Sequence, residues 1–184
     1  MRTDGHFGAV GLISGLLCFA VAADAAMVTK RLGTGLAPSS PGDDLPQAWA
    51  APVEEAPVID GRLDETCWSA ARPIVLGKLE RHGQATPQTE VRFLRKGGTL
   101  YLGVKLSEPK VEKLKREAAR HDGPAWEDDS VELFLQPRPD RAYFQVVTSA
   151  SGAVYDRQGH GEPSEWDSGA TAATAVGKEG WSLE

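Results

Sequence analysis

Apolar and polar residues alternate over most of the chain after residue 52, as they do in strands that bury one face. The segment TEVRFLRKGGTLYLGVKL, residues 89–106, shows this pattern best. Val91 and Phe93 share one face of its first half, and every second residue from Leu100 to Leu106 is apolar in its second half. The intervening KGGT supplies the two glycines of a tight turn. The segment is therefore predicted to be a β-hairpin.

Five more segments have strand patterns: VELFL (131–135), AYFQVVTSA (142–150), AVYD (153–156), ATAATAV (170–176) and GWSLE (180–184). In VELFL the apolar Val131, Leu133 and Leu135 share one face, and Glu132 and Phe134 share the other. Many short strands separated by Gly and Pro turns predict an all-β fold, an antiparallel β-sandwich. Because the sequence stops within an apolar strand, we expect the C-terminal strands of the sandwich to be missing from it.

Only two short helices are expected. In LDETCWSAA, Asp64 is the predicted N-cap of one helical turn whose inward face consists of Leu63, Cys67 and Trp68. In EPKVEKLKREAARHD, residues 108–122, the spacing predicts a charged helix with an apolar stripe formed by Val111, Leu114 and Ala118.

The N-terminal stretch MRTDGHFGAVGLISGLLCFAVAADAAM has a different character. Its apolar core, Ala9 to Ala22, is shorter than the roughly 20 residues that a helical membrane span needs, and Ala23-Asp24-Ala25 forms a small-x-small cleavage pattern. We predict a signal peptide over residues 1–25, a flexible linker over 26–51 and one domain over 52–184. The expected location is secreted, periplasmic or cell-surface. An uncleaved anchor is the alternative, because the first residues carry a single arginine and an aspartate.

Charge and cysteine content narrow the possible partners. The 184 residues include 20 basic and 26 acidic ones, giving a formal net charge of −6. With no basic cluster, nucleic acid is not expected as a partner, and neither is a membrane after signal cleavage. Cys18 leaves with the signal peptide, so Cys67 remains alone and no intramolecular disulfide is expected. Beside Trp68, Cys67 is expected to be a small buried hydrophobe rather than a nucleophile.

The segment GPAWEDDSVELFLQP, residues 123–137, holds a tryptophan and four acidic residues beside a strand. It allows three interpretations: a sugar-binding platform, the carboxylate pair of a hydrolase, or a metal site. A pyranose has an apolar face that stacks on an aromatic ring and a rim of hydroxyls that need polar partners, and Trp126 and Glu132 offer both. The alternative for Trp126 is that it packs over the edge of the sandwich.

The other two interpretations have weaker signals. A glycoside hydrolase needs two carboxyl groups about 5 to 9.5 Å apart, and a domain of short strands leaves little room for a substrate cleft. We therefore predict a binding module without catalysis of its own. Asp128 and Asp129 are candidates for capping turns, for binding Ca²⁺, or for simple solvation, but no DxDxDG loop is present. The histidines share no metal-ligand spacing and are expected on the surface: His82, His121 and His160.

Taken together and in this order, six blocks resemble the family 9 carbohydrate-binding modules. They are PVIDGRLDETCWSAA, VRFLRKGGTLYLGVKLSEP, WEDDSVELFL, YFQVVTSASGAVYD, WDSGATAATAV and GWSLE, and they span about residues 52–184. The resemblance implies a jelly-roll-like or immunoglobulin-like β-sandwich. It also implies binding to the ends of polysaccharides or oligosaccharides, in a module usually attached to secreted glycoside hydrolases such as xylanases, which act in polysaccharide catabolism. A structural Ca²⁺ is also found in the family.

The resemblance further implies which residues contact the sugar. Two tryptophans clamp the terminal sugar in the family, and Trp126 matches the first of them. Glu132 matches the acid that accepts hydrogen bonds from hydroxyls, and the strand FQVVTSA offers Gln145 and Thr148 for further polar contacts. The family usually has Arg and Asn in that strand, so Val146 and Val147 are departures. The second clamp residue belongs to strands beyond residue 184, unless Trp166 or Trp49 replaces it.

Two further interpretations stay open at this point. One is a non-catalytic spacer sandwich within a larger surface protein. The other is a haem-binding electron-transfer domain, since such domains share related architectures and often use a methionine ligand. Met1 and Met27 are the only methionines and lie outside the predicted domain, which speaks against haem.

Overall fold

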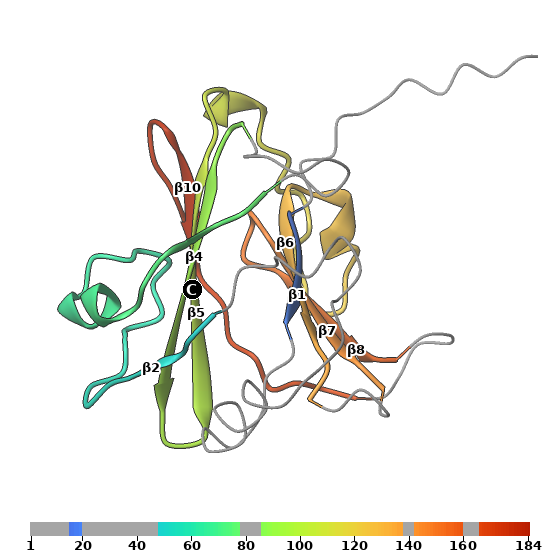
Figure 1. Cartoon of the computed structure of the whole chain (residues 1–184). Helices are drawn as coiled ribbons and strands as arrows, with labels where there is room; N and C mark the ends of the chain where they lie inside the picture. Colours follow the sequence, from blue (N-terminus) through green and yellow to red (C-terminus); the bar gives the residue numbers. More distant parts are fainter. Residues whose placement is uncertain (1–14, 20–47, 78–85, 138–141, 160–165) are drawn as a thin grey trace, which may run out of the picture.

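The computed structural model describes residues 48–77, 86–137, 142–159 and 166–184, together with the backbone of residues 15–19. Two β-sheets lie against each other as layers (Figure 1), which confirms the predicted β-sandwich. Helical structure in the described residues consists of three short 3₁₀ turns. None of the helices described here has the length and apolar character that crossing a membrane requires.

The larger sheet has six strands. Their order is β2-β4-β5-β10-β9, and β3 pairs with β4 along the same edge as β2. The strands are β2 (Ala51–Pro52), β3 (Ile74–Val75), β4 (Thr89–Lys96), β5 (Thr99–Ser107), β9 (Thr174–Val176) and β10 (Gly180–Leu183). The β4–β5 hairpin closes at Lys96↔Thr99, and Gly97 takes a positive φ of 57° in its turn, so the predicted hairpin is confirmed. Unlike the other pairs, β2 runs parallel to β4.

The smaller sheet has four strands in the order β1-β6-β7-β8. They are β1 (Gly15–Phe19), β6 (Ser130–Leu135), β7 (Phe144–Ser149) and β8 (Val154–Gln158). The pairs β6–β7 and β7–β8 are antiparallel, whereas β1 lies parallel to β6. Strand β1 belongs to the apolar segment for which a signal peptide is predicted. The rest of that segment, and residues 26–47 of the predicted linker, lie outside the described residues.

The main core lies between the two sheets. It combines residues of both layers: Ile74, Val91, Phe93, Val104, Leu106, Val131, Leu133, Ala150, Trp181 and Leu183. Val131 and Leu133 on β6 belong to it, so the predicted division of that strand into a core face and an outer face is confirmed. Glu132 and Phe134, which alternate with them, therefore point away from the core.

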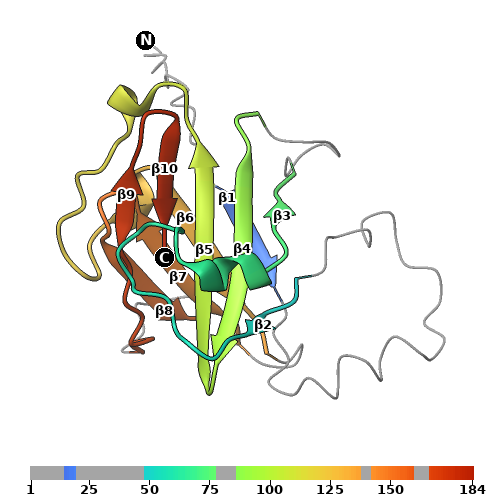
Figure 2. The same cartoon turned by 90° about the vertical axis from the view of Figure 1, so that its left-hand side faces the viewer.

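A second, smaller cluster covers the outer face of the six-stranded sheet. The 3₁₀ turn η1 (Thr66–Ala70) lies across β4 and β5 (Figure 2) and buries Trp68, which is 3% exposed. Gly103 is the residue of β5 that lies under the Trp68 ring. A Cβ atom at this position would lie 2.8 Å from the ring, which is too close, so the packing requires glycine. Leu63 and Cys67 pack there as predicted, but the N-cap is Glu65 and its side chain makes no capping bond. The prediction of Asp64 as N-cap is therefore wrong.

Glu184 joins this cluster to the end of β10. One carboxylate oxygen accepts a hydrogen bond from Trp68 Nε1 at 2.8 Å, and the other accepts the amides of Asp60 and Gly61 at 3.1 and 3.0 Å. Burial raises the pKa of Glu184, and the nearby charge of Glu65 raises it further. Burial also raises the pKa of Cys67, which agrees with a packing role for that thiol rather than a nucleophilic one.

The helix predicted over residues 108–122 does not form. Only η2 (Val111–Lys113) is helical there, as a single 3₁₀ turn. Carboxylates take the amides that a helix would need: Asp129 accepts from Lys115 N at 2.7 Å, and Asp128 accepts from Glu117 N and Ala118 N at 3.0 and 2.9 Å. These side-chain bonds come from residues 10 to 14 positions away and compete with the backbone hydrogen bonds of a helix.

Candidate functional site

The outer face of the four-stranded sheet collects the side chains that point away from the core. Because paired residues of antiparallel strands share a face, the register Glu132↔Val147↔Tyr155 places these three on the outer face. The register Phe134↔Gln145 adds a second row beside them. The 3₁₀ turn η3 (Ala125–Glu127) packs over β6 and β7 on this side of the sheet (Figure 1).

Trp126 is held outward by the turn that contains it. Ala125 is fully buried, and its amide donates to the Gly123 carbonyl at 2.7 Å. On the other side of Trp126, the buried Asp128 donates its amide to the Ala125 carbonyl at 3.3 Å. With both ends anchored, the Trp126 side chain remains 44% exposed. Its ring meets Tyr155 edge-on, with centroids 4.7 Å apart and an interplanar angle of 73°, a favourable aromatic geometry.

Glu132 and Gln145 supply the polar part of the same face. Both are partly buried, and Gln145 Nε2 donates a hydrogen bond to Glu132 Oε2 at 3.0 Å. Tyr155 lies two strands from Glu132, about 10 Å away at the usual strand spacing. The face therefore combines the exposed Trp126 and the half-buried Tyr155 with a carboxylate–amide pair within the dimensions of a small ligand.

Thr148 does not join these residues. It pairs with Val131, so its side chain lies on the core face of β7, and it is only 7% exposed. The structure thus brings together Trp126, Glu132 and Gln145 and separates Thr148 from them.

Neither replacement considered for the second tryptophan faces Trp126. Trp166 packs against Phe144, with centroids 4.7 Å apart, and Phe144 lies on the core face because it pairs with Leu135. Trp49 is 57% exposed but lies two residues before the start of β2, which belongs to the other sheet. The aromatic neighbour that Trp126 has is Tyr155.

Sequence reasoning missed Tyr155 as a site residue. The pattern of AVYD predicts a strand but does not assign its two faces. The signal that finds Tyr155 is the register of β8 on β7, which sets it opposite Val147 and so in the same cross-strand row as Glu132. That register depends on the turn between the strands, which alternation alone does not specify.

Asp128, two residues after Trp126, holds the surrounding loops together through its hydrogen bonds. Asp128 accepts three hydrogen bonds: from Glu117 N at 3.0 Å, Ala118 N at 2.9 Å and Ser149 Oγ at 2.7 Å. Burial alone would raise the pKa of Asp128, but the bonds from Ser149, Glu117 and Ala118 outweigh it and lower the pKa below its ordinary value.

The hydrogen bonds to Asp128 and Asp129 affect how well these carboxylates could bind Ca²⁺. N–H and O–H donors point at both oxygens of Asp128, where a cation would need lone pairs. Asp129 also accepts an amide, that of Lys115. Three of the roughly four lone-pair sites of the Asp128 carboxylate are taken by these bonds, and Ca²⁺ binding by Asp128 and Asp129 stays a prediction.

A family model and a solved structure are similar to the chain. No curated protein matches it. A crystal structure of a presumed carbohydrate-binding protein from Bacteroides uniformis is similar at 16% identity, covering 73% of this chain and 68% of that one, with a TM-score of 0.49. The model of the family described as "Carbohydrate family 9 binding domain-like" matches residues 59–184, which include η1, β3 to β10 and the outer face described above. The chain therefore belongs to the carbohydrate family 9 binding domain-like family.

Proposed function

We propose that this protein binds a saccharide on the outer face of its four-stranded sheet, through Trp126, Tyr155, Glu132 and Gln145, and that it has no catalytic activity of its own. One observation carries the proposal. An exposed tryptophan, anchored at both ends of its turn, lies on the same sheet face as a hydrogen-bonded carboxylate–amide pair. The family to which the chain belongs supports carbohydrate as the ligand.

The aromatic pair suits the apolar side of a sugar ring. A pyranose presents C–H groups on its face, and an exposed indole offers a flat apolar surface for them. Trp126 needs no rearrangement to do this, since its turn already holds it outward and Tyr155 supports one ring edge. Such pre-organisation reduces the entropy lost on binding.

The polar pair suits the hydroxyl rim. Glu132 uses one oxygen for Gln145, which leaves its second oxygen as an acceptor for a sugar hydroxyl. Gln145 retains its carbonyl oxygen and one N–H for a neighbouring hydroxyl. Hydrogen bonds to the charged carboxylate are the stronger ones, so Glu132 is the main orienting group in this proposal.

The finer biological role follows from the same proposal. A binding domain without catalysis serves by holding a linked activity near its substrate, and we infer a glycoside hydrolase linked to this one that acts in polysaccharide catabolism. The protein would work outside the cytoplasm, in secreted, periplasmic or cell-surface form. It would recognise polysaccharide or oligosaccharide ends, so partial hydrolysis of a polymer should increase the number of binding sites per gram.

Titration calorimetry and affinity electrophoresis of the full chain against xylan, cello-oligosaccharides and simple sugars test this proposal. We expect binding to at least one of them and its loss in Trp126→Ala. Trp49→Ala is the matched control, because it removes another exposed tryptophan from the opposite sheet and should leave binding unchanged. Truncating a core tryptophan costs about 3–5 kcal/mol, so a nearly unchanged melting temperature in Trp126→Ala would exclude a packing role. Absence of binding to every glycan would contradict the proposal.

A further inference from the structure

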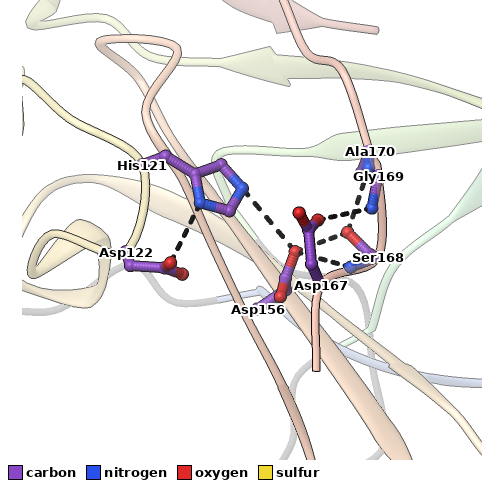
Figure 3. Close-up of polar contacts among 7 residues, drawn as sticks. All are labelled: His121, Asp122, Asp156, Asp167, Ser168, Gly169 and Ala170. Carbon is purple, nitrogen blue, oxygen red and sulfur yellow. Dashed lines mark hydrogen bonds and ion pairs between the residues drawn. The ribbon is translucent and has the colours of Figure 1, made fainter. Parts of the chain in front are cut away.

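Three titratable side chains from distant parts of the chain meet beside β8. They are His121 from the loop before η3, Asp156 on β8 and Asp167 from the segment before β9, and one ligand atom of each lies within 4.8 Å of the others. Figure 3 shows the imidazole and the two carboxylates gathered at one point. We propose that His121, Asp156 and Asp167 form a site for a divalent transition-metal ion of the Zn²⁺ type.

Asp156 is a buried carboxylate whose hydrogen bonds are incomplete. It is 4% exposed, because it lies on the core face of β8, opposite Val146. Its Oδ2 atom accepts hydrogen bonds from Ser168 N at 3.1 Å and from Ser168 Oγ at 2.5 Å. Its Oδ1 atom is buried and has no hydrogen-bond partner. A buried carboxylate with an unsatisfied oxygen is costly, and a cation bound at the Oδ2 side would stabilise the charge of the whole carboxylate.

His121 is oriented as a metal ligand would be. Its Nδ1 atom lies 3.1 Å from Oδ2 of Asp122, so the Nδ1 proton is donated there and the Nε2 lone pair is left for a cation. Nε2 lies 3.7 Å from Oδ2 of Asp156 (Figure 3). Asp122 is itself fixed, since its amide donates to the Val154 carbonyl on β8 at 2.9 Å. A carboxylate on the far nitrogen of a histidine is the usual support of a zinc-binding imidazole.

Asp167 provides the third ligand, and it lies on the solvent-exposed side of the site. One of its oxygens accepts the Gly169 amide at 2.7 Å, which fixes the carboxylate and leaves the other oxygen available. His121 and Asp167 are both exposed, so an ion can enter and water can complete its coordination. Two ligand atoms about 2.1 Å from a tetrahedral Zn²⁺ are separated by about 3.4 Å. His121 Nε2 and Asp156 Oδ2 lie 3.7 Å apart, which is close to this separation.

The donor set selects the class of metal. Ca²⁺ and Mg²⁺ prefer ligand sets made of oxygen atoms, whereas an imidazole combined with carboxylates suits Zn²⁺ and its neighbours. Two carboxylates and a neutral imidazole also balance the charge of a divalent ion. The bound ion would connect the His121 loop, β8 and the segment before β9, and so stabilise the fold.

Calorimetric titration of the chelator-treated full chain with ZnCl₂ tests the site, with CaCl₂ and MgCl₂ as comparisons. We expect one Zn²⁺ per chain, no comparable binding of the other two ions, and a rise in melting temperature of about 5 °C or more at saturating Zn²⁺. Co²⁺ in place of Zn²⁺ should give the visible absorption of a tetrahedral site. These measurements do not depend on saccharide binding.

Variants distinguish this site from incidental binding elsewhere on the chain. His121→Gln and Asp167→Asn change exposed side chains and should weaken Zn²⁺ binding at least about 10-fold, while Asp122→Asn should weaken it by about 10-fold through the imidazole. Asp64→Asn, an exposed acid beside η1, is the matched control and should bind as the wild type does. No Zn²⁺ binding, or equal binding by the His121 and Asp167 variants, would overturn the proposal.

Discussion

Glu132 and Gln145 lie on neighbouring strands, and their contact determines what the carboxylate can still accept. The hydrogen bond between them occupies one oxygen of Glu132 and orients the other within the outer face. Both residues are held by paired strands, so their positions do not depend on a mobile loop. The rim of the proposed sugar site is therefore rigid before any ligand arrives.

Replacing Glu132 by Gln tests the role of its charge at almost constant shape. A hydrogen bond to a charged group is worth about 1.5–3 kcal/mol, so saccharide affinity should fall roughly 10- to 100-fold in calorimetry. The melting temperature should change little, because Glu132 lies outside the main core. Glu112→Gln, in the exposed η2 turn, serves as control and should keep full affinity. Unchanged affinity in Glu132→Gln would remove this residue from the site.

The face on which a side chain lies could be predicted only where the alternation within a single strand determines it. Alternation within VELFL was enough to place Glu132 opposite the core face. Thr148 required the register of β7 on β6, and that register puts it beneath the sheet with Val131. The grouping of His121, Asp156 and Asp167 joins three distant segments, and no spacing along the chain indicates it.

At the scale of elements, strands were easier to predict than helices. The hairpin β4–β5 has alternation in both strands and glycines in its turn, so local and global preferences agree. Residues 108–122 have a helical spacing, yet Asp128 and Asp129 capture their amides from a distance in sequence. A local pattern cannot reveal such a competitor. Strands β2 and β3 have two residues each, too few for any periodicity.

The contribution of Asp128 to the free energy of unfolding, measured as a function of pH, tests how strongly its hydrogen bonds stabilise this loop. Asp128→Asn should lower the free energy of unfolding by about 1.5–3 kcal/mol at neutral pH, because an amide cannot accept all three bonds. The pKa of Asp128 is lowered in the folded state, so its stabilisation is complete above the ordinary value of 3.8 and disappears as the pH falls through the folded-state pKa.

Urea unfolding followed by tryptophan fluorescence measures this difference. The gap between wild type and Asp128→Asn should narrow as the pH is lowered from neutral to below about 3.8. The exposed acid Asp64 provides a control, since Asp64→Asn should match the wild type throughout. A gap that stays constant with pH would show that the ionised form of Asp128 contributes nothing.

At the scale of the whole molecule, the β-sandwich forms because the apolar faces of the two sheets pack against each other. Strands of both sheets direct their apolar sides inward, and the outer faces then differ. One is covered by η1 and Trp68, and the other presents Trp126. The number of sheets could be inferred from the sequence, but the strand order could not. Placing β10 between β5 and β9 requires contacts across the whole chain.

The N-terminal segment contains β1, which pairs with β6 and also lies within the predicted signal peptide, residues 1–25. A short apolar core followed by Ala23-Asp24-Ala25 favours cleavage over membrane anchoring, so we expect the exported protein to begin at Ala26. β6 would then form one edge of its sheet. Mass spectrometry of the protein from a secreting host measures this. Ala25→Arg should block processing, whereas Ala22→Leu, outside the cleavage pattern, should not. An exported chain that retains Met1 would show that the segment stays with the domain.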